Sequence, residues 1–150
     1  WVTVEAETDY IKNCFEEYNA HTDPSGRYFT LYKRWHLIGL EVGVSVASVA
    51  LRNEPTGVAT GWNADVVATA KRDLKPGDIL DGEGGYTVWG KLLPASTSKR
   101  MGGLPLGMAH SVKVVRAVAK GQSLCWDDVQ MDPNTAAFKI RREMESAYTF

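Results

Sequence analysis

Hydrophobic side chains recur at helical spacing in three stretches of the chain, which are residues 9–19, 36–52 and 136–147. In the first stretch Cys14, Phe15 and Tyr18 share one face, and Thr8 or Asp9 is placed to cap the start. The last stretch contains several Lys, Arg and Glu residues. The pattern therefore predicts a short amphipathic helix near the start, a second helix after residue 36 and a helical tail.

The second of these stretches carries small residues at a regular interval. Gly39 and Gly43 are four residues apart, and Ala47 continues the series. A stripe of this kind lets another backbone pack closely. Ordinary helix packing in a soluble core accounts for it without a special contact.

Short strand-like runs separated by turns make up much of the remaining sequence, namely residues 2–4, 27–32, 66–70, 86–92 and 112–118. A connector with turn residues precedes residue 63, and the second half is rich in glycine turns. We therefore expect an α+β fold that is mostly β. Its predicted parts are an α+β segment (1–62), a small β unit (63–132) and a helical tail (133–150).

The β unit contains an internal repeat at an offset of 44 residues, between 70–80 and 114–124. The equivalent positions are Arg72 and Arg116, Leu74 and Val118, Gly77 and Gly121, and Leu80 and Leu124. Each copy places an apolar residue before a turn whose glycine suits a positive φ, and an apolar residue follows. Neither copy buries enough surface alone, so the two should pack as a pseudo-symmetric pair.

Composition and charge narrow the class of protein. The chain has 150 residues, 44% of them hydrophobic, and a formal net charge of −1. This balance offers no electrostatic attraction for nucleic acid or for an anionic membrane. Cys14 and Cys125 have no partner at metal spacing and suit reduced thiols, so we expect a cytoplasmic protein. The chain begins at Trp1 without a secretory leader, and we expect it to be a piece of a longer protein.

The repeat resembles the signature of the SAF domain family, in which a basic residue, an apolar residue and a glycine turn occur twice before an acidic turn. Here the acidic turn is Trp126-Asp127-Asp128-Val129. The resemblance implies a β-clip fold, which is compact, mostly antiparallel and rich in long loops.

The flanking blocks resemble homoserine-dehydrogenase-like NAD(P)-dependent oxidoreductases, including the 1-deoxyxylulose-5-phosphate-reductoisomerase-like branch. The blocks that carry this resemblance are residues 32–41 (YKRWHLIGLE), 67–77, 80–90 (LDGEGGYTVWG) and 103–107 (GLPLG). They cover nearly the whole chain. One departure is Lys33-Arg34, where the family usually has Arg-Pro.

This resemblance implies the C-terminal portion of an oxidoreductase, in which the SAF unit shapes the substrate site or a dimer interface. The implied partners are an N-terminal Rossmann domain of the parent chain, a small-molecule substrate and further copies in a homo-oligomer. No GxGxxG fingerprint occurs, and the glycines of residues 82–85 have the wrong spacing. We therefore expect no cofactor in this chain and no activity from it alone, with NAD(P) implied for the full-length relative. The alternative is a stand-alone SAF-type module that binds a sugar or carboxylate.

The candidate site residues gather before and at the start of the second predicted helix. Arg27, Tyr32, Lys33 and Arg34 form a basic and aromatic group that suits a phosphate or carboxylate substrate. His36 and Glu41 are the catalytic candidates, either as an acid/base pair or as a pair whose members orient each other. Their spacing of five is not that of one helix face. No metal site is expected.

Overall fold

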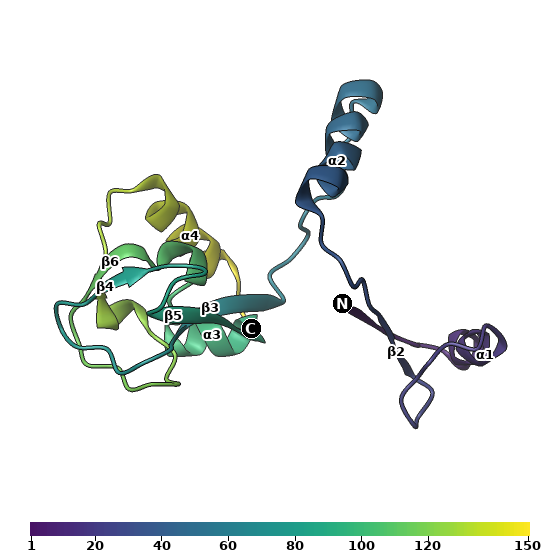
Figure 1. The fold of residues 1–150 in the computed structure, drawn as a ribbon, viewed down its shortest axis with the longest axis horizontal. Coiled ribbons are helices and arrows are strands. Elements are labelled where there is room, and N and C mark those ends of the chain that lie inside the picture. Colours follow the sequence, from purple (N-terminus) through teal and green to yellow (C-terminus); the bar gives the residue numbers. More distant parts are fainter. The chain divides into compact units, whose positions relative to one another are not determined.

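The computed structural model describes all 150 residues, which form two compact units, Trp1–Val58 and Ala59–Phe150. Their elements are seven strands, four α-helices and two short 3-10 turns (Figure 1). The predicted α+β class is confirmed. The boundaries at residues 62 and 132 stay predictions.

The first unit contains a strand pair and two helices. Strand β1 (Val2–Glu5) pairs antiparallel with β2 (Tyr28–Leu31), with Val2 opposite Leu31. Helix α1 (Asp9–Glu17) begins where predicted, because the Thr8 hydroxyl accepts a hydrogen bond from the Ile11 amide at 3.3 Å. Helix α2 (Ile38–Arg52) ends at Asn53, whose left-handed backbone (φ 60°) stops the helix.

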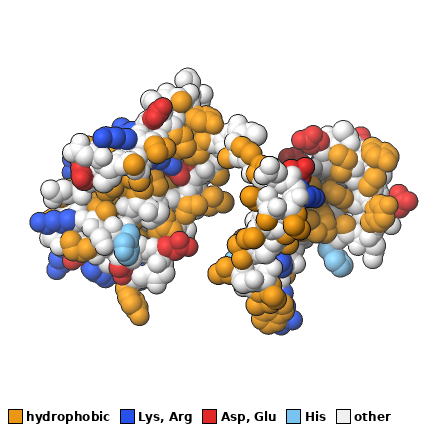
Figure 2. Space-filling view, turned by 90° about the horizontal axis from the view of Figure 1, so that it is seen from above, with side chains coloured by type: hydrophobic (Ala, Val, Ile, Leu, Met, Phe, Trp, Pro, Cys, Tyr) orange, Lys and Arg blue, Asp and Glu red, His pale blue; other side chains and the backbone are white.

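The first unit has almost no hydrophobic core. Ala6 is its single fully buried hydrophobic residue, and the Phe15 and Phe29 rings meet with centroids 5.6 Å apart. In α2 only Ser48 is buried. Hydrophobic side chains are widely visible on the surface in the space-filling view (Figure 2), and those of α2 are among the most exposed. The apolar surface of this unit is therefore not buried within the unit itself.

The second unit contains two small antiparallel sheets, β3–β5 and β4–β6–β7. Its strands are β3 (Ala64–Ala70), β4 (Ile79–Asp81), β5 (Val88–Pro94), β6 (His110–Val114) and β7 (Val129–Gln130). Its helical elements are α3 (Ala95–Met101), η1 (Leu106–Met108), η2 (Trp126–Asp128) and α4 (Ala136–Ala147). The tail helix has the predicted bounds, and the acidic turn at residues 126–129 contains η2.

The two copies of the repeat meet at Leu74 and Val118. The Leu74 amide donates to the Val118 carbonyl at 2.8 Å, and the Val118 amide donates back to the Leu74 carbonyl at 3.0 Å. Leu74 is 1% exposed and Val118 7% exposed. Since these positions are equivalent in the two copies, the exchange lies on a local twofold axis. The predicted pseudo-symmetric pairing is confirmed.

The hydrogen bonds on either side of this pair follow the same symmetry. The Gly77 amide donates to the Val114 carbonyl and the Gly121 amide to the Ala70 carbonyl, both at 2.8 Å. Exchanging the two copies, so that Gly77 is replaced by Gly121 and Val114 by Ala70, converts one bond into the other. Both glycines have positive φ, 99° and 84°, as their turns were expected to require.

The pairing encloses the core of this unit. Buried apolar side chains from both copies pack with those of the intervening strands, and the most buried are Leu74, Leu80, Leu104, Leu124, Val88 and Val114. Leu80 and Leu124 are equivalent in the repeat and are both completely buried. The core therefore depends on both halves of the repeat.

Helix α4 is fixed to this unit by a buried ion pair. The Arg141 guanidinium contacts both oxygens of Asp65 at 3.2 and 2.5 Å, and its Nε donates to Glu145 at 2.8 Å. Ser98 of α3 donates to the same Asp65 carboxylate at 2.6 Å. Because Arg141 and Asp65 are both largely shielded from solvent, losing either would leave an unpaired buried charge.

We predict that Gly77→Ala and Gly121→Ala each lower the free energy of unfolding by about 1–2 kcal/mol, because alanine is strained at positive φ. Neither added methyl group meets another atom within 4 Å, so the cost is one of backbone conformation. Gly107→Ala is the matched control, because it also faces open space and lacks a positive φ. Chemical denaturation should show equal losses for the two turn variants and little change for the control. Unequal losses would contradict their equivalence.

Candidate functional site

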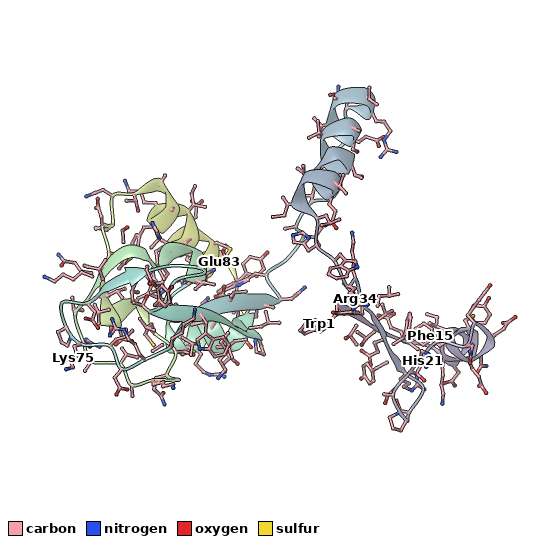
Figure 3. The ribbon with its side chains drawn as sticks, viewed as in Figure 1. Trp1, Phe15, His21, Arg34, Lys75 and Glu83 are labelled. Atoms are coloured by element: carbon pink, nitrogen blue, oxygen red, sulfur yellow. The ribbon has the colours of Figure 1, made fainter.

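The candidate residues gather where β2 passes into α2. Residues 32–37 have no regular secondary structure and carry Lys33, Arg34 and His36. Arg34 lies on this segment in Figure 3. Glu41 belongs to the first turn of α2. The segment thus brings Lys33 and His36 into contact with the Glu41 carboxylate.

Glu41 is the centre of this group. Its Oε2 lies 2.8 Å from His36 Nδ1, and its Oε1 forms an ion pair with Lys33 Nζ. The Leu37 amide also donates to Oε1, at 3.4 Å. Because His36 precedes the helix, a spacing of five does not keep it from Glu41. Lys33, His36 and Glu41 are called the Glu41 cluster below.

The surroundings of Glu41 favour its charged form. Hydrogen bonds from Lys33 and His36, in that order, lower the pKa of the Glu41 carboxyl from 4.5 to about 2. A group with this pKa stays ionised near neutral pH and is poorly suited to exchange a proton there. Of the two roles predicted for the His36–Glu41 pair, the geometry favours mutual orientation.

The basic side chains of the cluster are open to solvent. The Lys33 and His36 side chains are 70% and 76% exposed, whereas that of Glu41 is 31% exposed. Arg34 lies over the Trp35 ring, 5.0 Å from its centroid, and Tyr32 is exposed. Lys33 and Arg34 carry permanent positive charges and only Lys33 is paired with Glu41, so the segment can attract an anionic group such as a phosphate or carboxylate.

Arg27 is the predicted binding residue that makes none of these contacts. Its guanidinium donates to Asp9 at 2.7 Å and to the Ala6 carbonyl at 3.1 Å, which ties β2 to the start of α1. These contacts indicate that Arg27 stabilises the packing of β2 against the start of α1. Its predicted role in binding substrate stays a prediction, as do those of Tyr32, Lys33, Arg34, His36 and Glu41.

The second unit has a hollow of about 390 Å³ between β6 and the segment before α4. It is lined by His110, Ser111, Gln130 and Asp132, among others. Ser111 has a positive φ of 57°, and His110 Nδ1 lies 3.2 Å from the Asp81 carbonyl.

The loop between β4 and β5 holds the glycines that lack a dinucleotide fingerprint. Asp81 closes it by accepting hydrogen bonds from the Tyr86 and Thr87 amides at 2.6 and 3.0 Å. A hydrogen bond from the Thr87 hydroxyl is the main reason why the pKa of Asp81 falls to about 2. Glu83 lies in this loop (Figure 3). The loop is thus a tight connection between strands.

Comparisons with known proteins bear on the first unit. Residues 1–42 match the family described as oxidoreductase DRL, catalytic domain. The match includes the whole Glu41 cluster and ends inside α2. No curated protein matches the chain. The N-terminal part of the chain is therefore similar to part of an oxidoreductase catalytic domain.

No three His, Cys, Asp or Glu side chains converge in a way that could hold a metal ion. No helix has the length and hydrophobicity needed to span a membrane.

We predict that the Glu41 carboxyl titrates near pH 2 and that Lys33→Met raises its pKa toward 4.5, because the strongest stabilising partner is lost. A lowered pKa adds stability that is complete above pH 4.5 and is lost as the pH falls toward 2. The carboxyl carbon shift of Glu41, followed by NMR between pH 7 and 1.5, measures both effects. A midpoint near 4.5 in the unmodified chain would contradict the cluster.

Proposed function

We propose that the chain is the C-terminal part of an NAD(P)-dependent oxidoreductase of the homoserine-dehydrogenase-like class. The observation that carries this proposal is the family match over residues 1–42, because it includes every predicted site residue. In this proposal, residues 1–58 complete a catalytic domain. NAD(P) binds to a Rossmann domain elsewhere in the parent protein.

In this proposal, the Glu41 cluster contacts the substrate. Lys33 and Arg34 would attract an anionic group of the substrate, and the Glu41 carboxylate would hold Lys33 and His36 in place. With Nδ1 of His36 engaged by Glu41, its Nε2 is left to face the substrate. Glu41 is thus a positioning residue, and Lys33 and His36 are the groups proposed to contact substrate.

We also propose that the second unit is an SAF-type β-clip. The support is the twofold repeat, whose copies exchange equivalent hydrogen bonds at Leu74 and Val118. In the parent enzyme this unit would shape the substrate site or join subunits. The alternative, a stand-alone module for a sugar or carboxylate, is favoured by the hollow beside His110, which is large enough for a small ligand.

The experiment that tests the proposal uses the oxidoreductase that contains this segment. Glu41→Gln should lower kcat/KM at least tenfold and leave the Kd for NADPH unchanged, because the cofactor binds elsewhere. Glu41→Asp should retain part of the activity, since it keeps the charge. Steady-state kinetics and a fluorescence titration with NADPH provide the two measurements.

Asp78→Asn is the matched control. Asp78 is another carboxylate with a lowered pKa, paired with Arg72 at 2.8 Å, and it lies in the second unit. Its replacement should leave kcat/KM close to that of the unmodified enzyme. NADPH turnover by residues 1–150 alone, or full activity of the Glu41→Gln enzyme, would refute the proposal.

A further inference from the structure

The second unit has another hollow, of about 370 Å³, where the end of α3 meets η2 and α4. Its wall consists of residues 99–102, residues 125–127 and Arg142, and it is called the α3 hollow below. No residue of the Glu41 cluster lines it. The volume lies at the lower end of the range of roughly 300–1,000 Å³ that is typical of small-molecule sites.

The wall of the α3 hollow carries more positive than negative charge. Lys99 and Arg100 come from the last turn of α3, and Arg142 comes from α4. Asp127 is the one acidic residue that lines the hollow. The wall therefore favours an anionic ligand.

The two cations of α3 are not neutralised within the chain. Lys99 Nζ donates to the Tyr148 carbonyl, and Arg100 donates to the Thr97 hydroxyl at 3.4 Å. Both acceptors are uncharged, and neither cation forms an ion pair. Their charges are thus left to act on whatever enters the hollow.

The carboxylates beside the hollow already have cationic partners. Asp127 lies 3.5 Å from Arg116. Glu145 pairs with Arg141 at 2.8 Å and with Arg142 at 2.5 Å. Because each carboxylate is engaged by a cation outside the wall, the excess of positive charge at the hollow remains.

The Trp126 ring forms a fixed part of the wall. It packs edge-on against Phe138 with centroids 5.5 Å apart, and the Arg142 guanidinium lies 5.6 Å from its centroid. The indole Nε1 is buried and has no acceptor in the chain. A Cβ built on Gly102 would lie 3.7 Å from Cδ1, the neighbour of Nε1, so this edge of the ring faces Gly102. Buried polar groups usually have a partner, and an anion seated beside Gly102 would provide one.

We propose that the α3 hollow binds a phosphate monoester of a small molecule. Its three cations and one carboxylate leave two net positive charges. A phosphate monoester carries a charge of about −1.5 to −2 at pH 7, which matches this excess better than a single carboxylate does. Guanidinium groups bind phosphate oxygens through paired N–H donors, and a lysine adds a point charge.

The rest of the hollow suits the organic part of the ester. Met101 and Cys125 line it beside Gly102 and present less polar surface than the cations do. A phosphate group alone would fill only part of the volume. The carbon skeleton of the ester therefore lies against these two side chains.

Titration of the full chain with inorganic phosphate and with glycerol 3-phosphate, at constant ionic strength, tests the site. Heteronuclear NMR follows the Trp126 indole N–H, which is identified by its loss in Trp126→Phe. We expect a saturable shift of this resonance, with tighter binding of the ester because it also contacts Met101 and Cys125. The Trp62 indole is an internal reference, since it too is buried without an acceptor but does not line the hollow, and it should not move.

Two substitutions should change the affinity in opposite directions. Arg100→Gln removes an exposed cation that forms no ion pair, and it should weaken binding about threefold to fivefold. Asp127→Asn removes the opposing carboxylate and should strengthen binding. Lys113→Gln is the matched control, because it removes an exposed cation of β6 that does not line the hollow, and it should leave the dissociation constant within about twofold.

A Trp126 resonance that does not respond to either phosphate compound would overturn the proposal. So would an equal loss of affinity in Lys113→Gln and Arg100→Gln, because the anion would then respond only to overall charge. Acetate that binds as tightly as glycerol 3-phosphate would contradict the choice of a phosphate. The proposed catalytic role would survive each of these results, since no residue of the Glu41 cluster lines the α3 hollow.

Discussion

The reciprocal backbone hydrogen bonds between Leu74 and Val118 are the interaction on which the second unit depends. They join equivalent residues of two similar segments, so the backbone amide of each segment donates to a carbonyl of the other. The glycine turns on either side repeat this arrangement, and Leu80 and Leu124 extend it into the core. Neither segment could bury its apolar residues alone. Because the pairing closes a core, the buried hydrophobic residues of this unit are held by contacts within it.

The first unit, in contrast, has almost no hydrophobic core of its own. Its strand pair and two helices bury one hydrophobic residue, Ala6, while α2 leaves most of its aliphatic surface exposed. The Glu41 cluster lies at the beginning of that same helix, so whatever orders α2 also orders the cluster. A segment with a formed ionic site but no core is what one expects of part of a larger catalytic domain, and the family match over residues 1–42 agrees.

Local rules predicted the features that depend on local forces. The bounds of α4 follow from its capping Thr135, and the repeat follows from matching residues, but α3 was missed. Its sequence has no apolar periodicity, and Ser98 is held by the distant Asp65.

The residue types of the candidate cluster were predicted from the sequence, whereas the distances between them were not. A spacing of five does not fit one helix face, but His36 precedes α2 and reaches Glu41 from outside the helix. Features that depend on contacts between residues far apart in the sequence, such as α3, thus cannot be predicted from local patterns.

Native-state hydrogen exchange tests the contrast between the two units most directly. The amides of Leu74 and Val118 should exchange only through complete unfolding of the second unit, because both are buried and hydrogen-bonded across its twofold axis. In dilute solution the amides of α2 should exchange orders of magnitude faster, since no core protects that helix. Equal protection of α2 and of the Leu74–Val118 pair in the dilute chain would contradict the account.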